Sequence, residues 1–220
     1  ALIALNAGLI EVVKASITGS IIANLLLVLG ASMFAGGLKK EEQSFNKTVS
    51  STAVTLLTIA AFALILPAAL HHTGGADSQM LDSKMALAIS IVLILLYFAN
   101  LLFSLKTHKH LLQPAAVTAE DADEVTASWS LKKSIAVLLG VTLLIVFLCE
   151  ELVGSVEHAA ATLGMTPVFV GVILLAIVGN AAENSTAVMM ARKNKMDLSL
   201  NIVLGSSTQI AMFVAPVVVI

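Results

Sequence analysis

Long apolar runs separated by short polar connectors dominate this 220-residue sequence. A membrane-spanning helix needs roughly 20 mostly apolar residues. This length predicts one spanning helix in each of six apolar runs, and residues 1–7 look like the last turns of a further helix. The six runs are 11–35, 48–70, 84–105, 131–153, 167–191 and 198–220. The pattern therefore predicts an all-α membrane protein built as a multi-span helical bundle.

One long polar segment, residues 106–130, divides the chain into a first half, 1–105, and a second half, 131–220. Because its four acidic residues lack the spacing and the glycine of an EF-hand, we expect a solvated linker and not a calcium sensor. These residues are Glu120, Asp121, Asp123 and Glu124. Both chain ends fall inside apolar runs, from which we expect the chain to be part of a longer protein.

The composition supports an integral, multi-pass membrane protein, since 58% of the residues are hydrophobic and only 12% are charged. A net charge of −2 gives no indication of a nucleic-acid partner. Lysine and arginine are distributed unevenly between the two sides of the predicted bundle: ten fall on one side, and only Lys14 and Lys84 fall near the other. The ten are Lys39, Lys40, Lys47, Lys106, Lys109, Lys132, Lys133, Arg192, Lys193 and Lys195. The positive-inside rule makes their side, and with it the acidic linker, cytoplasmic.

Two stretches near opposite ends of the chain resemble each other when one is shifted by 186 residues. Both contain an acidic residue, an apolar run, a Gly-Ser pair and a second apolar run, and Gly19-Ser20 aligns with Gly205-Ser206. In the predicted threading the two units cross the membrane in opposite directions. Inverted-topology repeats are typical of transporters, whose substrate site lies at the repeat interface. At the same shift the counterpart of Glu183 falls upstream of Ala1, where we expect a second "GNxxE"-like motif.

A glutamate within the apolar run 167–191 is the main candidate for chemistry. Glu183 belongs to the stretch "VGNAAENST", in which Gly179, Asn180 and Glu183 share one helical face. A charge at the centre of a span costs roughly 2.5–3.5 kcal/mol on insertion scales. Glu183 should therefore face protein or a water-filled cavity, or be protonated, and Gly179 should allow another backbone to approach. The alternative is a packing glycine with a glutamate that is hydrogen-bonded across helices.

The two Gly-Ser units add further oxygen and amide groups at the same depth. Asn24 follows Ser20 by one helical turn, and Gln209 lies close after Ser206. Amides away from water must find polar partners. Together with the Glu183 carboxylate, the proposed metal ligand, these groups form the oxygen-rich set that hard cations such as Ca²⁺ prefer. No cysteine or histidine cluster occurs at this depth, which disfavours zinc and copper.

Three further glutamates follow or end the span 131–153. Glu150, Glu151 and Glu157 fall near the predicted outer mouth, where they could attract cations or relay protons along an access path. The alternative is an ordinary helix end at the membrane interface.

The stretches "VGNAAENSTAVMMARKNKMDLSLNIVLGSSTQIAMFV" and "GLIEVVKASITGSIIANLLLVLGASMFAGGL" resemble the calcium/proton antiporters of the CAX type, within the cation/calcium exchanger superfamily. The resemblance implies ten core helices plus an N-terminal regulatory helix in two inverted halves. It also implies that Glu183 is one of two essential cation-binding glutamates. Asn180, Gln209, Ser206 and Ser20 would then line the site.

The resemblance implies export of Ca²⁺ from the cytoplasm in exchange for H⁺, with no cofactor and with Ca²⁺ as the transported substrate. The membrane would be a bacterial plasma membrane or a vacuolar-type membrane. Burial disfavours a charged carboxylate and a bound cation favours it, so protons and Ca²⁺ would compete for the same oxygens.

The alternatives are a sodium/calcium exchanger, a non-transporting structural membrane protein, and an intramembrane enzyme, for which no activated nucleophile is evident. The sequence is also compatible with a homo-oligomer.

Overall fold

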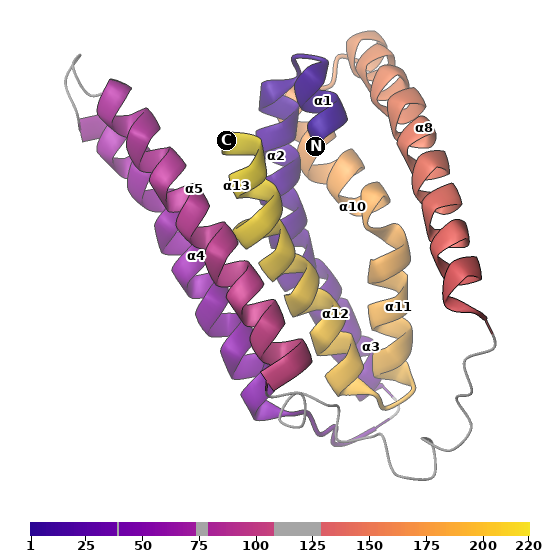
Figure 1. The fold of residues 1–220 in the computed structure, drawn as a ribbon. Coiled ribbons are helices and arrows are strands. Elements are labelled where there is room, and N and C mark those ends of the chain that lie inside the picture. Colours follow the sequence, from indigo (N-terminus) through magenta and orange to yellow (C-terminus); the bar gives the residue numbers. More distant parts are fainter. Residues whose placement is uncertain (39, 74–78, 108–128) are drawn as a thin grey trace.

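The computed structural model describes residues 1–38, 40–73, 79–107 and 129–220, and this part of the chain is almost entirely helical (Figure 1). Five of the described helices are long and apolar enough to cross a membrane, and a sixth span results if one bent pair is counted together. The five are Ile10–Gly37, Lys47–Pro67, Ser83–Thr107, Leu131–Leu152 and Met196–Val219; the bent pair is Val170–Gly179 with Ala181–Arg192. The predicted multi-span helical membrane protein is therefore confirmed.

Several spans contain a short π-helical segment between two α-helical ones. In the first half the elements are α1 (Leu2–Asn6), α2 (Ile10–Ile22), η1 (Ala23–Val28), α3 (Leu29–Gly37), α4 (Lys47–Thr73), α5 (Gln79–Leu102) and η3 (Phe103–Thr107). In the second half they are α8 (Leu131–Leu163), α9 (Pro167–Phe169), η4 (Val170–Leu175), α10 (Ala176–Gly179), α11 (Ala181–Arg192), α12 (Met196–Gln209), η5 (Ile210–Val214) and α13 (Ala215–Val219).

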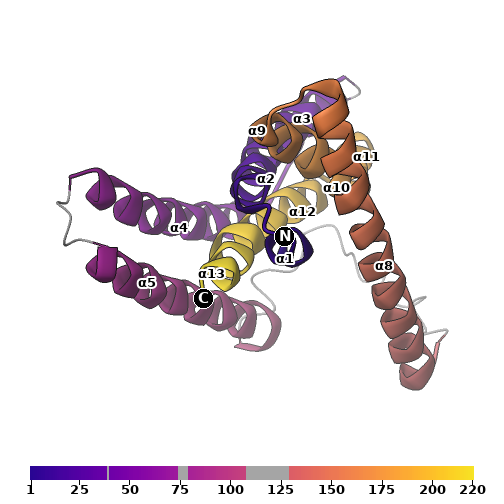
Figure 2. The same cartoon turned by 90° about the horizontal axis from the view of Figure 1, so that it is seen from above.

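The central group of helices comes from both halves of the chain. The α2–α3 span packs against η4, α11 and α12. Seen from above, α4 and α5 lie side by side on one side of this group, and α8 lies on the other side (Figure 2). Small buried side chains let the central helices approach: Val28 of η1, Ala187 of α11 and Val203 of α12 form one core cluster where these three elements meet.

The backbone confirms the internal repeat at the 186-residue shift. Gly8 and Asn194 both have a left-handed conformation, with φ of 78° and 61°. The turns around them also use equivalent hydrogen bonds, from Leu9 N to Ala4 O (3.0 Å) and from Lys195 N to Met190 O (2.9 Å). The helices that follow begin at Ile10 and Met196, and each passes into a π-helical segment, η1 or η5, at an equivalent depth.

The two repeat units run in opposite directions. In Figure 1, α2 starts at the end of the bundle where α13 finishes, and α12 starts at the end where α3 finishes. The same view shows that α4, α8 and α12 start, and α5 and α11 finish, at this second end. The described lysines and arginines of the predicted cytoplasmic side belong to these helix ends or to the adjoining connector, so their clustering at one end is confirmed.

Glycines allow α2 and η4 to cross at close range. A Cβ atom on Gly171 would lie 2.6 Å from Ala15 Cβ and 2.7 Å from Val12 O, and one on Gly19 would lie 2.6 Å from Val172 Cα. Because side chains at these positions would hold the backbones apart, the crossing depends on both glycines.

Two features concern the limits of the predicted segments. The apolar span of α4 ends at Pro67, within the predicted run 48–70, and the helix itself continues through the proline to Thr73. Continuing as a helix satisfies the remaining backbone groups, which an irregular chain in an apolar surrounding would not do. The four acidic residues of the 106–130 linker lie outside the described residues.

Candidate functional site

The bent helix breaks at Asn180, and the side chain of Asn180 forms hydrogen bonds at the break. The segments on either side of it, Val170–Gly179 and Ala181–Arg192, are inclined by 59°. Asn180 Nδ2 donates to Ala176 O at 3.0 Å, and it also donates to Ser20 Oγ at 3.2 Å. The break is thereby joined to the Gly-Ser pair of the first repeat.

The carboxylate of Glu183 is joined to the Gly-Ser pair of the second repeat. Glu183 lies in the first turn of α11, where the helix dipole favours a negative charge. The Ser206 hydroxyl of α12 donates a hydrogen bond of 2.8 Å to Glu183 Oε2. The predicted motif and both Gly-Ser units are therefore neighbours: Asn180 bonds to one and Glu183 to the other.

Glu183 faces an open pocket of about 410 Å³ between α11 and α12, here called the Glu183 pocket. The pocket is lined by Ala182, Glu183, Thr186, Asn201, Ile202, Gly205, Ser206 and Gln209. The Glu183 side chain is exposed to this space and is not buried, which corrects the expectation of a buried glutamate. Among the described residues, those that line the pocket opposite Glu183 belong to α12, and no lysine or arginine forms an ion pair with Glu183.

The remaining predicted ligands divide into pocket residues and buried residues. Gln209 lines the Glu183 pocket, whereas Ser20 is buried behind it as the acceptor for Asn180. Asn24 is 1% exposed, and neither polar atom of its amide has a hydrogen-bond partner in the described part of the chain. Asn24 is not among the residues that line the Glu183 pocket; it belongs to η1, which packs against α12.

The predicted access-path glutamates lie on α8, away from the pocket. Glu150 and Glu151 are exposed and do not line the Glu183 pocket. The Glu157 side chain lies outside the described part of the structure. Gly179 also differs from the expectation of close backbone approach, since an added Cβ would meet no described atom within 4 Å. The close approaches occur at Gly19 and Gly171 instead.

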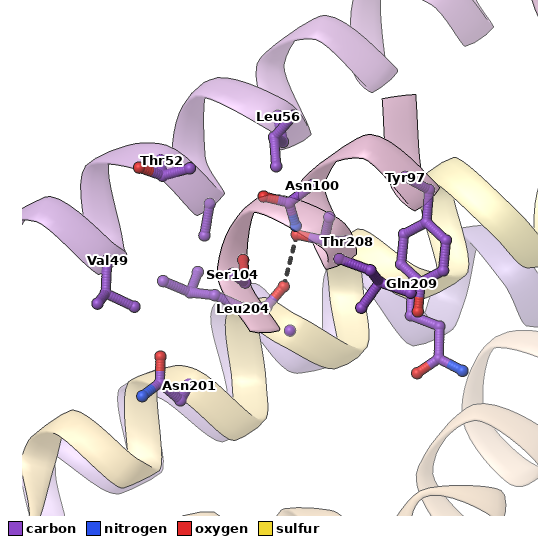
Figure 3. A pocket seen from close by; sticks show the side chains of 13 residues that line it. Val49, Thr52, Leu56, Tyr97, Asn100, Ser104, Asn201, Leu204, Thr208 and Gln209 are labelled. Atoms are coloured by element: carbon purple, nitrogen blue, oxygen red, sulfur yellow. Dashed lines mark hydrogen bonds between the residues drawn. The ribbon is translucent and has the colours of Figure 1, made fainter. Parts of the chain in front are cut away.

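A second pocket adjoins the same face of α12, and the sequence did not reveal it. This pocket, here called the α4–α5 pocket, has a volume of about 320 Å³ and lies where α4, α5, η3 and α12 meet (Figure 3). Asn201, Gly205 and Gln209 line both pockets. The spacing of these three residues at i, i+4 and i+8 places them on one helical face. This spacing is the sequence pattern from which a polar face on α12 could have been predicted. Asn100 contributes from α5 but stands alone in an apolar run.

The Glu183 pocket offers carboxylate, hydroxyl and amide oxygens, a set suited to a hard cation. No group of three or more histidine, cysteine, aspartate or glutamate side chains forms a metal cluster in the described residues. The Asn180 side chain, three residues before Glu183, bonds to Ser20 of the first repeat, so the pocket lies beside the contact between the two inverted repeats. The fold therefore defines an integral membrane protein with two inverted repeats.

The comparison with protein families assigns the chain more narrowly. The profile of the family described as sodium/calcium exchanger protein matches residues 1–106 and 133–220. The chain therefore belongs to the sodium/calcium exchanger protein family.

Curated relatives and solved structures agree with this assignment. A Ca²⁺/H⁺ antiporter of Aphanothece halophytica is 44% identical over 230 residues, covering 100% of this chain and 62% of the relative. The Ca²⁺/H⁺ antiporter ChaA of Bacillus subtilis is 42% identical over 219 residues, with the same two coverages, 100% and 62%. The structure of native YfkE superposes with a TM-score of 0.75 at 38% identity, over 98% of this chain and 59% of YfkE. The chain thus spans about three fifths of the length of these relatives.

Proposed function

We propose that this chain carries the cation-binding half-site of a Ca²⁺/H⁺ antiporter, and that Glu183 binds the transported Ca²⁺ and the counter-transported proton in turn. The observation that carries the proposal is the 2.8 Å hydrogen bond from Ser206 to Glu183, which holds the carboxylate against the Gly-Ser pair of the second repeat, three residues after the Asn180 side chain that bonds to Ser20 of the first repeat. The similar proteins named Ca²⁺/H⁺ antiporter and vacuolar cation/proton exchanger support the choice of ions.

The role of each ligand follows from the geometry. Glu183 supplies the negative charge, and Ser206 orients its Oε2 atom. No described residue donates a hydrogen bond to Oε1, which can take a cation or a proton. Gln209 and Thr186 line the same space and offer neutral oxygens. Asn180 is a positioning residue, because its amide holds the helix break against Ser20. Since one carboxylate cannot hold a proton and a cation on the same oxygens, each ion displaces the other.

Exchange follows if the loaded site opens to the two sides of the membrane alternately. The break at Asn180 is the natural flexible point, because a helix interrupted there can change its 59° bend without unfolding either part. A proton gradient then drives Ca²⁺ out of the cytoplasm, because only the protonated or the Ca²⁺-loaded site crosses between the two states.

The decisive experiment is Ca²⁺ uptake by the intact protein in inverted membrane vesicles with an imposed proton gradient. Glu183→Gln keeps the shape and the acceptor for Ser206 but removes the charge, so we expect uptake to be abolished. Glu42→Gln, an exposed glutamate of the α3–α4 connector, is the matched control and should transport normally. Normal uptake by Glu183→Gln would refute the assignment.

The sodium/calcium exchanger is the second candidate, since the family profile carries that description. The two candidates differ in the coupling ion. We expect the uptake to need the proton gradient and to be unaffected when sodium replaces potassium on both sides of the vesicle membrane. Uptake that needs a sodium gradient and ignores the proton gradient would favour the second candidate.

A further inference from the structure

The α4–α5 pocket extends from the lysine- and arginine-rich end of the bundle toward the middle of α12. Its residues nearest that end are Val49, two positions into α4, and Ser104 in η3. Gln209, the last residue of α12, lines it at the deep end. Near that depth the ring of Tyr97, which lines the pocket, stacks on Phe213 of η5 with 5.4 Å between ring centroids.

The polar groups of this pocket have too few protein partners for an apolar surrounding. Thr52 and Thr208 donate to carbonyls of their own helices, to Thr48 O and Leu204 O. By contrast, five further lining side chains have no hydrogen-bond partner for their polar atoms among the described residues. They are Tyr97, Asn100, Ser104, Asn201 and Gln209, and Figure 3 shows them around the pocket. Polar groups at membrane depth must be satisfied by protein or by water, so this pocket is built to hold water.

The pocket also meets the Glu183 pocket along one face of α12. Asn201, Gly205 and Gln209 line both spaces. Gly205 leaves the passage between them open, since an added Cβ would meet no described atom within 4 Å. None of the lining residues of the α4–α5 pocket is charged. A hydrated cation can therefore be held weakly by neutral oxygens and released, which is what a conducting site requires.

We propose that the α4–α5 pocket is a water-filled vestibule through which a hydrated divalent cation passes from the lysine- and arginine-rich side to Glu183, across the Asn201–Gly205–Gln209 face of α12. Asn100 and Gln209 act as its neutral oxygen ligands along the way. This inference rests on the proposed function for the identity of the cation, but the hydration of the pocket is independent of it.

Thiol labelling of the intact protein tests the vestibule. All cysteines, Cys149 included, are first replaced, and single cysteines are introduced as Asn100→Cys and Leu102→Cys. Leu102 is the control because it is exposed on the outer face of α5 and lies closer to the lysine- and arginine-rich end than Asn100. A cationic, membrane-impermeant methanethiosulfonate is applied to that side. Because a thiol in apolar surroundings forms little thiolate, we expect the deeper Asn100→Cys to react about tenfold faster than Leu102→Cys.

The second readout is Ca²⁺ uptake by the same vesicles. Modification of Asn100→Cys should block uptake, and Ca²⁺ should slow the labelling. Ser104→Cys serves as the alternative vestibule position if Asn100→Cys is not produced as a folded protein. Labelling of the vestibule positions no faster than that of Leu102→Cys would show a dry pocket, and fast labelling with undiminished uptake would show a pocket off the cation path; either result overturns the proposal. If the unmodified protein exchanges no Ca²⁺ for protons, the proposed function fails, while the labelling rates still report on the vestibule.

Discussion

The Ser206 hydroxyl donates a 2.8 Å hydrogen bond to Glu183 Oε2, and so ties the carboxylate of α11 to the Gly-Ser pair of α12. Hydrogen bonds to charged groups contribute roughly 1.5–3 kcal/mol. The neighbouring Ser207 is fully buried, and its hydroxyl donates to Val203 O within the same helix. Two adjacent serines of α12 therefore differ in that only one of them contacts the candidate ligand.

Ser206→Ala should lower the apparent affinity for Ca²⁺ without abolishing transport. The variant removes one oxygen from the pocket and lets the Glu183 carboxylate rotate away from it. A loss of about 1.4 kcal/mol corresponds to a tenfold weaker affinity. The measurement is the Ca²⁺ concentration for half-maximal uptake in inverted vesicles, compared with that of Ser207→Ala. Equal affinities in the two variants would contradict the role given to Ser206.

The left-handed backbone at Gly8 and Asn194 predicts that alanine destabilises both turns, whereas glycine does not destabilise the turn at position 194. A non-glycine residue in this conformation costs roughly 1–2 kcal/mol, and asparagine tolerates it better than alanine. Gly8→Ala and Asn194→Ala should therefore lower the free energy of unfolding, whereas Asn194→Gly should leave it unchanged or raise it. The midpoint of thermal unfolding of the detergent-solubilised intact protein measures this. Alanine and glycine at position 194 giving the same midpoint would argue against the left-handed backbone there.

The sequence predicted the spans and the direction of the two repeats, because these follow from local hydropathy and from a repeated motif. That Glu183 and Ser206 line one site was implied only by the resemblance to the antiporters. The sequence did not predict which glycines lie at a helix crossing. Gly179 and Gly171 look alike in the sequence, but only Gly171 faces another backbone. Nor did it predict the α4–α5 pocket, because Asn100 becomes part of a polar cluster only when α5 is placed beside α12.

The crossing of α2 and η4 makes Gly171 sensitive to the smallest side chain. The methyl group of Gly171→Ala would lie 2.6 Å from Ala15 Cβ, so the two helices must separate. Overpacking of this kind typically costs roughly 1–3 kcal/mol. Gly140→Ala on α8, where an added Cβ meets no described atom within 4 Å, is the control and should not be destabilised. Gly171→Ala should therefore unfold at a lower temperature than Gly140→Ala. Equal midpoints of thermal unfolding would mean that the two helices do not cross as closely as the structure places them.

Gly205→Leu should separate stability from transport. An added Cβ at Gly205 meets no described atom within 4 Å, so the leucine side chain extends into the space shared by the two pockets instead of displacing a neighbour. Replacing a glycine within a helix by leucine favours the helix by roughly 0.5–1 kcal/mol. We therefore expect an unchanged or higher thermal midpoint together with a large loss of Ca²⁺ uptake.

The matched control for this variant is Gly30→Leu on α3, which is exposed and likewise has no described atom within 4 Å of an added Cβ. It makes the same chemical change, but Gly30 lines neither the Glu183 pocket nor the α4–α5 pocket, so Ca²⁺ uptake should be retained. If Gly205→Leu transports as well as Gly30→Leu, cations do not cross the Asn201–Gly205–Gln209 face. If it unfolds at a lower temperature instead, the space at Gly205 is occupied in the intact protein.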